Sequence, residues 1–469
     1  MISIYVTKRF GSILLILPVL VLILADSGDV GVYQNAIVSV AFAFSSMFIS
    51  TYITSTLGSK QALCLGLCMY TIFVICSCMQ HLFRGYSAIV SNSSAIVGAL
   101  VAGIGGGVLW TSEGVYFAQA SKSYSVLTGE DVSLNTSYFA NIFAFIFLVG
   151  EILLKAMSTM FVTWLNFKQI WLYSIYAIVC ILSSMNMFIV IDYSERSPNA
   201  TSLSQSGCGE KALGSMRLFQ TDAKMKYMVL MPTAFGMTSA FLNTFVGGHV
   251  IPVALSPDND ESLSIEYLVG AMSASAAASA SLVNFLLATT RLSEVKMENL
   301  MVVGALSYAT IPFIFILLPR FSEWNLPMIL CVYVIMGVGR AMYEGPLQSA
   351  FALFFPEAKQ KEGAFANKAL SYGVGSAVGF LLNIYLKCSD EGTYCIRYNN
   401  NSLHYVLPLE ILLIIFACLG FAGFWVAHIM HRSCQRFQLC TEDEDEIVVT
   451  EFEGTLLEEE GEKDYSLEC

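Results

Sequence analysis

Charged residues are scarce in this chain. They make up 13% of its 469 residues, whereas hydrophobic residues make up 56%. A soluble domain carries about a quarter of its residues as charges, because its whole surface faces water. This composition therefore argues against a soluble protein of this length.

The motifs of soluble enzymes are also missing. The chain has no GxxxxGK phosphate loop, and its five histidines lack the spacing of a metal site. Gly103 and Gly105–Gly107 superficially resemble a dinucleotide-binding fingerprint, but they lie in an apolar run with no preceding strand. We expect a protein that is not an enzyme, that has no metal or cofactor, and that does not bind nucleic acid.

Long apolar runs are what the chain has in abundance. Since a helix needs roughly 20 apolar residues to cross a bilayer, the runs predict an all-α membrane protein with about twelve transmembrane helices. The predicted spans cover 10–25, 33–56, 61–84, 88–112, 137–163, 170–191, 227–253, 264–289, 298–319, 326–354, 365–386 and 405–430. The first is short, begins after Lys8 and Arg9 and also resembles a signal peptide. We expect it to be retained as a helix.

Basic residues predict the orientation. An N-terminus in the cytoplasm places most loop Lys and Arg residues on the cytoplasmic side, among them Lys60, Lys122 and Lys368, and few, such as Arg84 and Arg320, on the other. Both termini are then cytoplasmic. The sequence leaves open whether the membrane is the plasma membrane or an endomembrane.

The last outer loop, between the spans at 365–386 and 405–430, carries two expected modifications. Cys388 and Cys395 flank it and favour a disulfide in an oxidising compartment, and Asn400 begins a glycosylation sequon. Asn92 begins a second outer sequon, close to the span at 88–112. Residues 432–469 form an acidic tail, of which the part from Thr441 to Cys469 alone carries −12, equal to the net charge of the whole chain. We expect this tail to be disordered, either as a solubilising extension or as a docking segment.

The two halves of the chain repeat each other. The fourth span ends in Trp110-Thr-Ser-Glu113-Gly114-Val-Tyr116, and the tenth ends in Arg340-Ala-Met-Tyr343-Glu344-Gly345. Each has an aromatic residue and then Glu-Gly near its cytoplasmic end. Two related six-helix bundles are the architecture of many secondary transporters. We therefore predict six-helix halves at 1–191 and 227–431, with a cytoplasmic linker at 192–226.

The fourth-span motif also resembles that of the unc-ninety-three-like family, a divergent branch of the major facilitator superfamily. The tenth-span motif and the run Ala364-Phe365-Ala366-Asn367 are similar to that family too, and the resemblance covers nearly all of 30–430. Family members often have Gln where this chain has Glu113.

The resemblance implies a major-facilitator fold. It implies two kinds of activity: a regulatory or escort subunit of another membrane protein, such as a potassium channel or a Toll-like receptor, or transport inferred from the fold. We expect the first. The alternative is a secondary transporter of a small solute, with or without coupling to protons.

Ionisable residues inside spans are candidate functional groups, because burying a charge in the membrane is costly. Glu113 and Glu344 are either an inner gate, working with loop cations such as Lys60 and Arg291, or a static brace between the bundles. The spacing of Arg340 and Glu344 makes a local ion pair the simplest arrangement. Trp110, Gly114, Tyr116, Tyr343 and Gly345 complete the two motifs.

Glu151 and Lys155 form the second candidate, four residues apart in the fifth span. They are either a self-neutralising pair or part of a solute or proton site. Five Asn residues are expected to make hydrogen bonds between helices: Asn141, Asn186, Asn243, Asn284 and Asn383. The Ala/Ser-rich run 271–281 predicts close helix packing.

Overall fold

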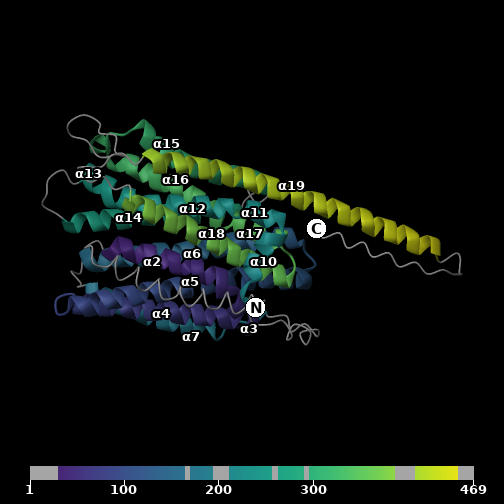
Figure 1. The fold of residues 1–469 in the computed structure, drawn as a ribbon, viewed down its shortest axis with the longest axis horizontal. Helices are drawn as coiled ribbons and strands as arrows, with labels where there is room; N and C mark the ends of the chain where they lie inside the picture. Colours follow the sequence, from purple (N-terminus) through teal and green to yellow (C-terminus); the bar gives the residue numbers. More distant parts are fainter. Residues whose placement is uncertain are drawn as a thin grey trace, which may run out of the picture.

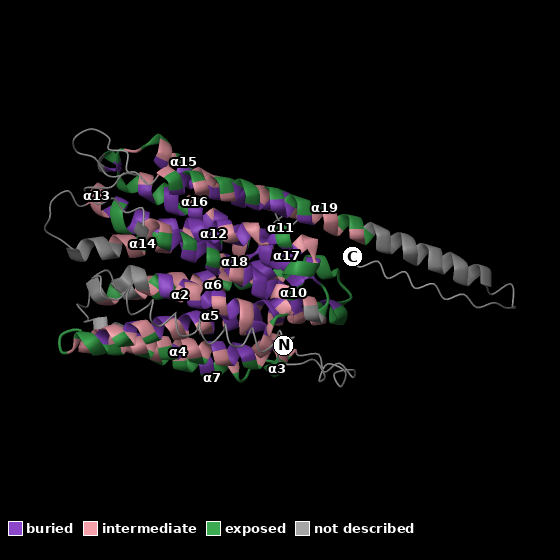
Figure 2. Ribbon diagram, in the orientation of Figure 1, coloured by how far each residue is buried: buried purple, intermediate pink, exposed green. Residues whose placement is uncertain are grey.

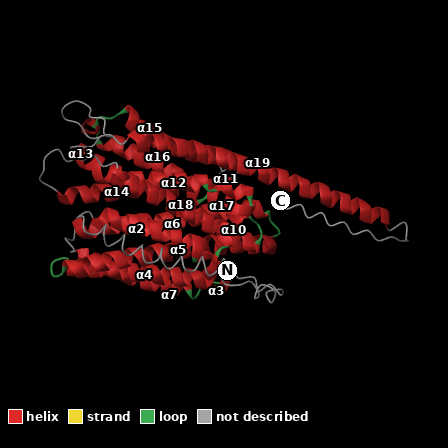
Figure 3. Cartoon of the chain, in the orientation of Figure 1, coloured by secondary structure: helices red, strands yellow, loops and turns green. Residues whose placement is uncertain are grey.

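A computed structural model describes residues 30–163, 169–193, 211–255, 262–289, 295–385 and 407–452. Helices make up the regular structure of these segments, and no strand occurs within them (Figure 3). Eight of their helices are long and apolar enough to cross a membrane, and a ninth span results if α2 and α3, which meet at 51°, are counted as one. The first predicted span, at 10–25, lies outside the described residues.

The N-terminal half contributes long helices that follow one another along the chain. They are α2 Val30–Phe48, α3 Ser50–Leu57, α4 Ser59–Phe83, α5 Ala88–Thr128, α6 Val132–Thr163 and α7 Gln169–Met187. Helix α5 begins at a Ser87 cap and ends at Gly129, whose φ of 72° suits glycine. Asn92 lies within the second turn of this helix.

The C-terminal half has more interruptions. Its elements are α12 Leu230–Phe241, η1 Leu242–Val250, α13 Ile251–Leu255, α14 Ser262–Thr289, α15 Met297–Leu317, η3 Phe321–Glu323, α16 Leu326–Glu344, α17 Pro346–Phe354, α18 Ala358–Tyr385 and α19 Leu407–Phe452. The η1 segment is a π-helix, a wider coil that often marks a functional site. A second break separates α16 from α17 at Gly345, because Pro346 has no N–H with which to continue the helix.

The two halves lie side by side. In Figure 1, α4 and α7 run along one edge of the molecule, and α15, α16 and α19 run along the opposite edge. The junction is formed by α2 against α18 and by α6 against α14. Ala277 and Ala280 of α14 are fully buried, and Gly337 of α16 leaves no room for a side chain beside Ala276. The small residues of this Ala/Ser-rich run thus let both α6 and α16 pack closely against α14.

The predicted linker region contains two short helices, α10 Gly214–Thr221 and α11 Ala223–Met228. Ser215 donates a hydrogen bond to the Met47 carbonyl (3.0 Å), and Asn367 donates one to the Ser215 carbonyl (2.8 Å). This end of the linker region therefore binds both α2 and α18. The region has helical content that the polar composition of 192–226 did not indicate.

Buried residues concentrate around α12 and α17, while exposed apolar side chains follow the outer helices (Figure 2). An apolar exterior suits lipid contact. Helix α19 continues to Phe452, beyond residue 432, where the acidic tail was expected to begin. Residues 453–469 lie outside the described residues, as do Cys388, Cys395 and Asn400.

Candidate functional site

A cavity of about 320 Å³ lies between the two halves. Helices α5 and α6 contribute Trp110, Glu113, Phe147, Glu151 and Lys155 to its wall. The opposite wall comes from α12, η1, α14 and α16–α18. It includes Phe235, Ser239, Asn243, Ser273, Arg340, Tyr343, Glu344, Gln348, Lys368 and Tyr372. The cavity is large enough for a small organic solute.

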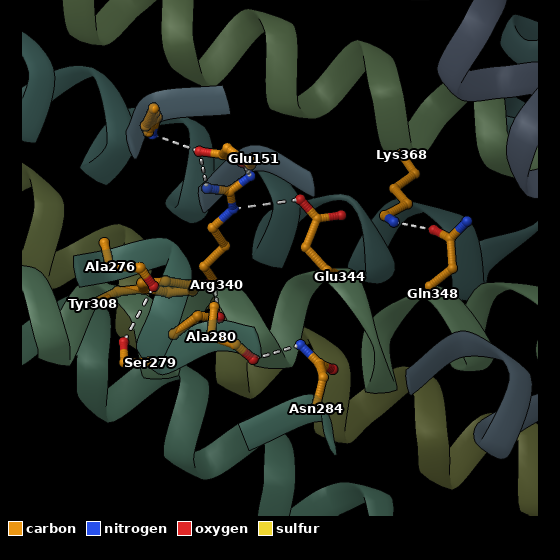
Figure 4. Close-up of polar contacts among 12 residues, drawn as sticks. Glu151, Ala276, Ser279, Ala280, Asn284, Tyr308, Arg340, Glu344, Gln348 and Lys368 are labelled. Atoms are coloured by element: carbon orange, nitrogen blue, oxygen red, sulfur yellow. Dashed lines mark hydrogen bonds and ion pairs between the residues drawn. The ribbon is translucent and has the colours of Figure 1, made fainter. Parts of the chain in front are cut away.

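The centre of this site is an ion-pair cluster that joins the halves (Figure 4). Arg340 of α16 donates two hydrogen bonds to Glu151 of α6, at 3.0 Å from Nη1 and 2.5 Å from Nη2. Lys155 donates to the same carboxylate at 2.6 Å and to Ser273 Oγ of α14 at 2.5 Å. Glu151 therefore neutralises two cations, and the two-pronged geometry fixes the Arg340 side chain.

Glu344 is held less tightly than the sequence suggested. Its Oε1 lies 3.7 Å from Arg340 Nε, which is an ion-pair distance but too long for a hydrogen bond. The local pair exists, yet Arg340 makes its closer contacts with Glu151. Spacing within one helix favoured Glu344 as the partner, and the approach of α6 to α16 supplied a better one.

Glu113 belongs to a second bridge between the halves. Gln348 of α17 donates a hydrogen bond to Glu113 Oε2 of α5 (2.9 Å), while Glu113 Oε1 is buried without a partner. Lys368 of α18 donates to the other end of the Gln348 amide, and its ammonium lies 4.4 Å from the centre of the Tyr343 ring. One amide thus links a carboxylate of one half to a lysine of the other.

Sequence reasoning missed both Gln348 and Lys368. Lys368 was counted among the cytoplasmic basic residues, but only 7% of its surface is exposed. Gln348 follows Glu344 by four residues, and on one continuous helix this spacing would have placed both side chains on the same face. The helix breaks at Gly345, so the spacing alone did not predict that Gln348 lines the site.

Of the two cations predicted to work with Glu113 and Glu344, the structure describes only Lys60, and it lies elsewhere. Lys60 donates to the Phe188 carbonyl at 3.1 Å, and Arg291 is outside the described residues. Trp110 does line the cavity, edge-on to Phe147. Tyr116 instead points away from it and donates to the Ile191 carbonyl at 2.9 Å.

The glycines of the two Glu-Gly motifs occupy equivalent positions. A Cβ at Gly114 would lie 2.2 Å from the Phe365 ring of the other half. A Cβ at Gly345 would lie 2.2 Å from Asn141 Oδ1 of the other half and 2.4 Å from Asn284 Oδ1. Each motif therefore brings one half into close contact with the other, at a point where only glycine fits.

The asparagines behave differently from expectation. Asn141, Asn284 and Asn383 each donate back to the carbonyl four residues earlier in their own helix, at 2.9, 2.9 and 2.7 Å. The Oδ1 atoms of Asn141 and Asn284 are buried without a hydrogen-bond partner. Both lie at Gly345, so these amides mark the contact between the halves.

A family model described as Major Facilitator Superfamily matches residues 4–380. The chain belongs to the major facilitator superfamily. This superfamily member is a multi-pass membrane protein and not an enzyme. None of the curated proteins matches the chain.

Solved structures of the superfamily share its fold. The proton:xylose symporter XylE bound to 6-bromo-6-deoxy-D-glucose is 13% identical, with a TM-score of 0.56, over 84% of this chain and 85% of that one. XylE from E. coli in a partially occluded inward open conformation is 14% identical, with a TM-score of 0.52 over 84% and 85%. FucP in the outward conformation is 12% identical, with a TM-score of 0.53 over 85% and 90%. At these identities the likeness concerns the fold.

This superfamily member has a second cavity, of about 520 Å³, beside the first. Asn141, Pro346 and Ser349 line it, together with Glu130 from the loop after α5 and Asn135 from the first turn of α6. Glu344 and Gln348 line the central cavity, so the segment from Glu344 to Ser349 faces both spaces. The contact of Gly345 with Asn141 and Asn284 lies between them. Among the described residues, no group of His, Cys, Asp and Glu side chains is placed to hold a metal ion.

Proposed function

We propose that this superfamily member is a secondary active transporter of a small solute, with the central cavity as its solute site. The observation that supports this most is that six charged side chains line one cavity, across which the Arg340–Glu151 and Gln348–Glu113 contacts link the two halves. Secondary transporters bind their solutes near the bilayer midplane, between their repeats. They expose the site to each side in turn when one half rocks against the other.

The two bridges give this movement a physical basis. For the halves to separate, Arg340 must leave Glu151, and Gln348 must leave Glu113. Each rupture exposes charged groups that need a new partner, because an unpaired charge in the membrane is costly. A solute or a proton can supply that partner. The bridges therefore make opening conditional on binding, which is what a coupled transporter requires.

Proton coupling follows from the same groups. A proton added to Glu151 removes the negative charge that holds Arg340 and Lys155. A proton added to Glu113 neutralises a carboxylate whose Oε1 is buried without a hydrogen-bond partner. The similar structures described as proton symporters support this part of the proposal. We assign the coupling role to Glu151 and Glu113 together.

The test is flux through purified protein in liposomes. We expect solute uptake to acidify or alkalinise the lumen in proportion to transport, as reported by a trapped pH dye. Glu151→Gln and Glu113→Gln should each abolish the proton signal. Glu323→Gln is the matched control, because Glu323 is exposed and pairs only with Arg320 on the surface. Flux of solute with no proton movement in wild type would contradict the coupling.

A regulatory or escort subunit is the second candidate. It is supported by the resemblance of the Trp110–Tyr116 motif to unc-ninety-three-like proteins. It is also supported by α19, which extends past the rest of the bundle as far as Phe452 (Figure 1). Such an extension offers a surface to a channel or receptor, with both termini on the cytoplasmic side. Co-purification from mild detergent tests it: a stoichiometric membrane-protein partner supports this role, and a partner-free preparation that transports solute contradicts it.

A further inference from the structure

We propose that the solute of the central cavity is an organic cation with an apolar body, held by Glu344 and Glu113 and by the aromatic wall. This inference rests on the proposed transport function and names its substrate class. The relation that carries it is an imbalance between the acids and the bases of the cavity. The net charge of the lining is zero, but each of its bases already donates to a partner, whereas two of its acids are held less closely.

The three bases are already engaged. Arg340 places both terminal nitrogens on Glu151, and Lys155 binds Glu151 and Ser273. Lys368 donates to Gln348 and lies over the Tyr343 ring. An anionic solute would have to displace one of these partners first. The cavity is therefore poorly prepared for a carboxylate or a phosphate.

Two of the three acids are not engaged in this way. Glu344 has its ion-pair contact at 3.7 Å, so its carboxylate can accept hydrogen bonds. Glu113 uses one oxygen for Gln348, and the other has no partner. Both carboxylates belong to the cavity wall. A positive group placed between them would receive charge-assisted contacts without breaking the Glu151 cluster.

The rest of the wall suits the remainder of such a solute. Rings from both halves line the cavity, including Phe42, Trp110, Phe147, Phe235, Tyr343 and Tyr372. Phe235 stacks on Tyr343 with ring centres 4.2 Å apart, and Tyr372 stacks on Phe235 at 5.4 Å. Aromatic faces attract cations and also cover apolar groups. The Lys368 ammonium already lies 4.4 Å from the centre of the Tyr343 ring, which shows that the wall accepts a positive charge.

A neutral sugar is the main competing class, since similar structures include symporters of xylose and fucose. A sugar needs many donors and acceptors around its hydroxyls. This cavity offers a few polar side chains between rings, and most of its donors are already used. The chemistry of the wall thus favours a cation over a polyol.

The experiment measures stabilisation of the purified full-length protein by a panel of defined probes. The cations are choline, tetraethylammonium and 2-phenylethylammonium, each paired with its uncharged isostere, such as 3,3-dimethylbutan-1-ol for choline. Xylose and isovalerate represent neutral sugars and anions. We expect a rise in melting temperature with at least one cation and none with its isostere. Counterflow in liposomes should move the same cation.

Variants locate the site. Glu344→Gln should weaken the apparent affinity for the cation by roughly tenfold or more, since a charge-assisted contact is lost. Trp110→Leu should weaken it as well, while Trp110→Phe, which keeps a ring, should largely retain it. Glu323→Gln should leave it unchanged. The melting temperature of each variant without probe shows that the fold is intact.

The outcomes separate the two proposals. If xylose, isovalerate or the isosteres stabilise the protein and are transported while the cations are not, the cation assignment is wrong and the transport function stands. If cations bind equally well to wild type and Glu344→Gln, the assigned site is wrong. If no probe class binds and no solute moves, the transport function itself fails.

Discussion

Arg340 and Glu151 are joined by two hydrogen bonds, of 3.0 and 2.5 Å, although 188 residues lie between them and they belong to different halves of the molecule. Glu151 also binds Lys155 at 2.6 Å. The carboxylate is therefore shared by two cations, whereas Arg340 has a second acid, Glu344, within 3.7 Å. Because of this asymmetry, we expect substitutions of Glu151 and of Arg340 to lower the stability of the protein by different amounts.

We expect Glu151→Gln to destabilise the protein more than Arg340→Gln does. Loss of Glu151 leaves Arg340 and Lys155 without their shared anion, and because the cluster is only partly buried, we expect a cost below the roughly 3–5 kcal/mol of a fully buried pair. Loss of Arg340 leaves Glu151 bound to Lys155, whose positive charge still neutralises the carboxylate. Melting temperatures in detergent measure the difference. Equal destabilisation of both variants would contradict the shared-carboxylate arrangement.

Gly345→Ala should disturb the contact between the halves. The added methyl group would lie 2.2 and 2.4 Å from Asn141 Oδ1 and Asn284 Oδ1, so both buried amides must shift from their positions, at a cost of about 1–3 kcal/mol. Flux and melting temperature should both change. Asn141→Ala in the same chain should restore part of the loss, because it removes one of the two clashing amides.

The matched control for this substitution is Gly150→Ala. Gly150 lies in α6, and nothing is within 4 Å of the position that its Cβ would take. This variant should fold and transport as wild type does. If Gly345→Ala is equally silent, the contact at Gly345 does not control the separation of the halves.

Gln348→Leu should weaken the second bridge at both ends. It removes the amide nitrogen that donates to Glu113 Oε2 and the amide oxygen that accepts from Lys368. Loss of one partner leaves the other buried groups unsatisfied, which costs more than the hydrogen bond itself contributed. We expect slower transport with a lower melting temperature, and Gln348→Glu to restore the contact to Lys368 alone. An unchanged transport rate in Gln348→Leu would show that the bridge is not broken during turnover.

The orientation with both termini in the cytoplasm makes a further prediction. Asn400 should carry an N-linked glycan, because its loop would be lumenal or extracellular. Asn400→Gln should abolish the mobility shift that a glycosidase produces on a gel. Asn135-Thr-Ser is also a sequon, but it would lie on the cytoplasmic side. Asn135→Gln should not alter that shift, because the Asn135 side chain is also buried and donates to Ser125 at 3.0 Å. A glycan that persists in Asn400→Gln would contradict this topology or place the modification at Asn92.

The sequence allowed the helical membrane architecture to be predicted, because each apolar run carries its own signal. It also identified Glu113, Glu151, Lys155, Arg340 and Glu344 as unusual, since a charge within a span is rare. It did not reveal which of them meet. The partner of Arg340 depends on how α6 approaches α16, and the local spacing to Glu344 suggested another answer.

Residues at the ends of spans were the hardest to interpret. Lys368 resembles an ordinary boundary lysine in the sequence, and only the packing of α18 shows that it faces the cavity. Tyr116 shares a motif with Trp110 and Glu113 and lies nearly one helical turn after Glu113, yet its hydroxyl donates to the Ile191 carbonyl and does not line the cavity. Which residues of a long helix line a cavity depends on how that helix packs against its neighbours, and a sequence motif does not specify that packing.

The most direct test of the central claim is counterflow through the purified protein in liposomes, with wild type and Glu151→Gln compared side by side. The account predicts that wild type accumulates at least one labelled small solute against preloaded unlabelled solute. It also predicts that Glu151→Gln fails to do so while remaining folded. If wild type moves no solute of any charge class and instead co-purifies with a stoichiometric channel or receptor, the transport function is contradicted.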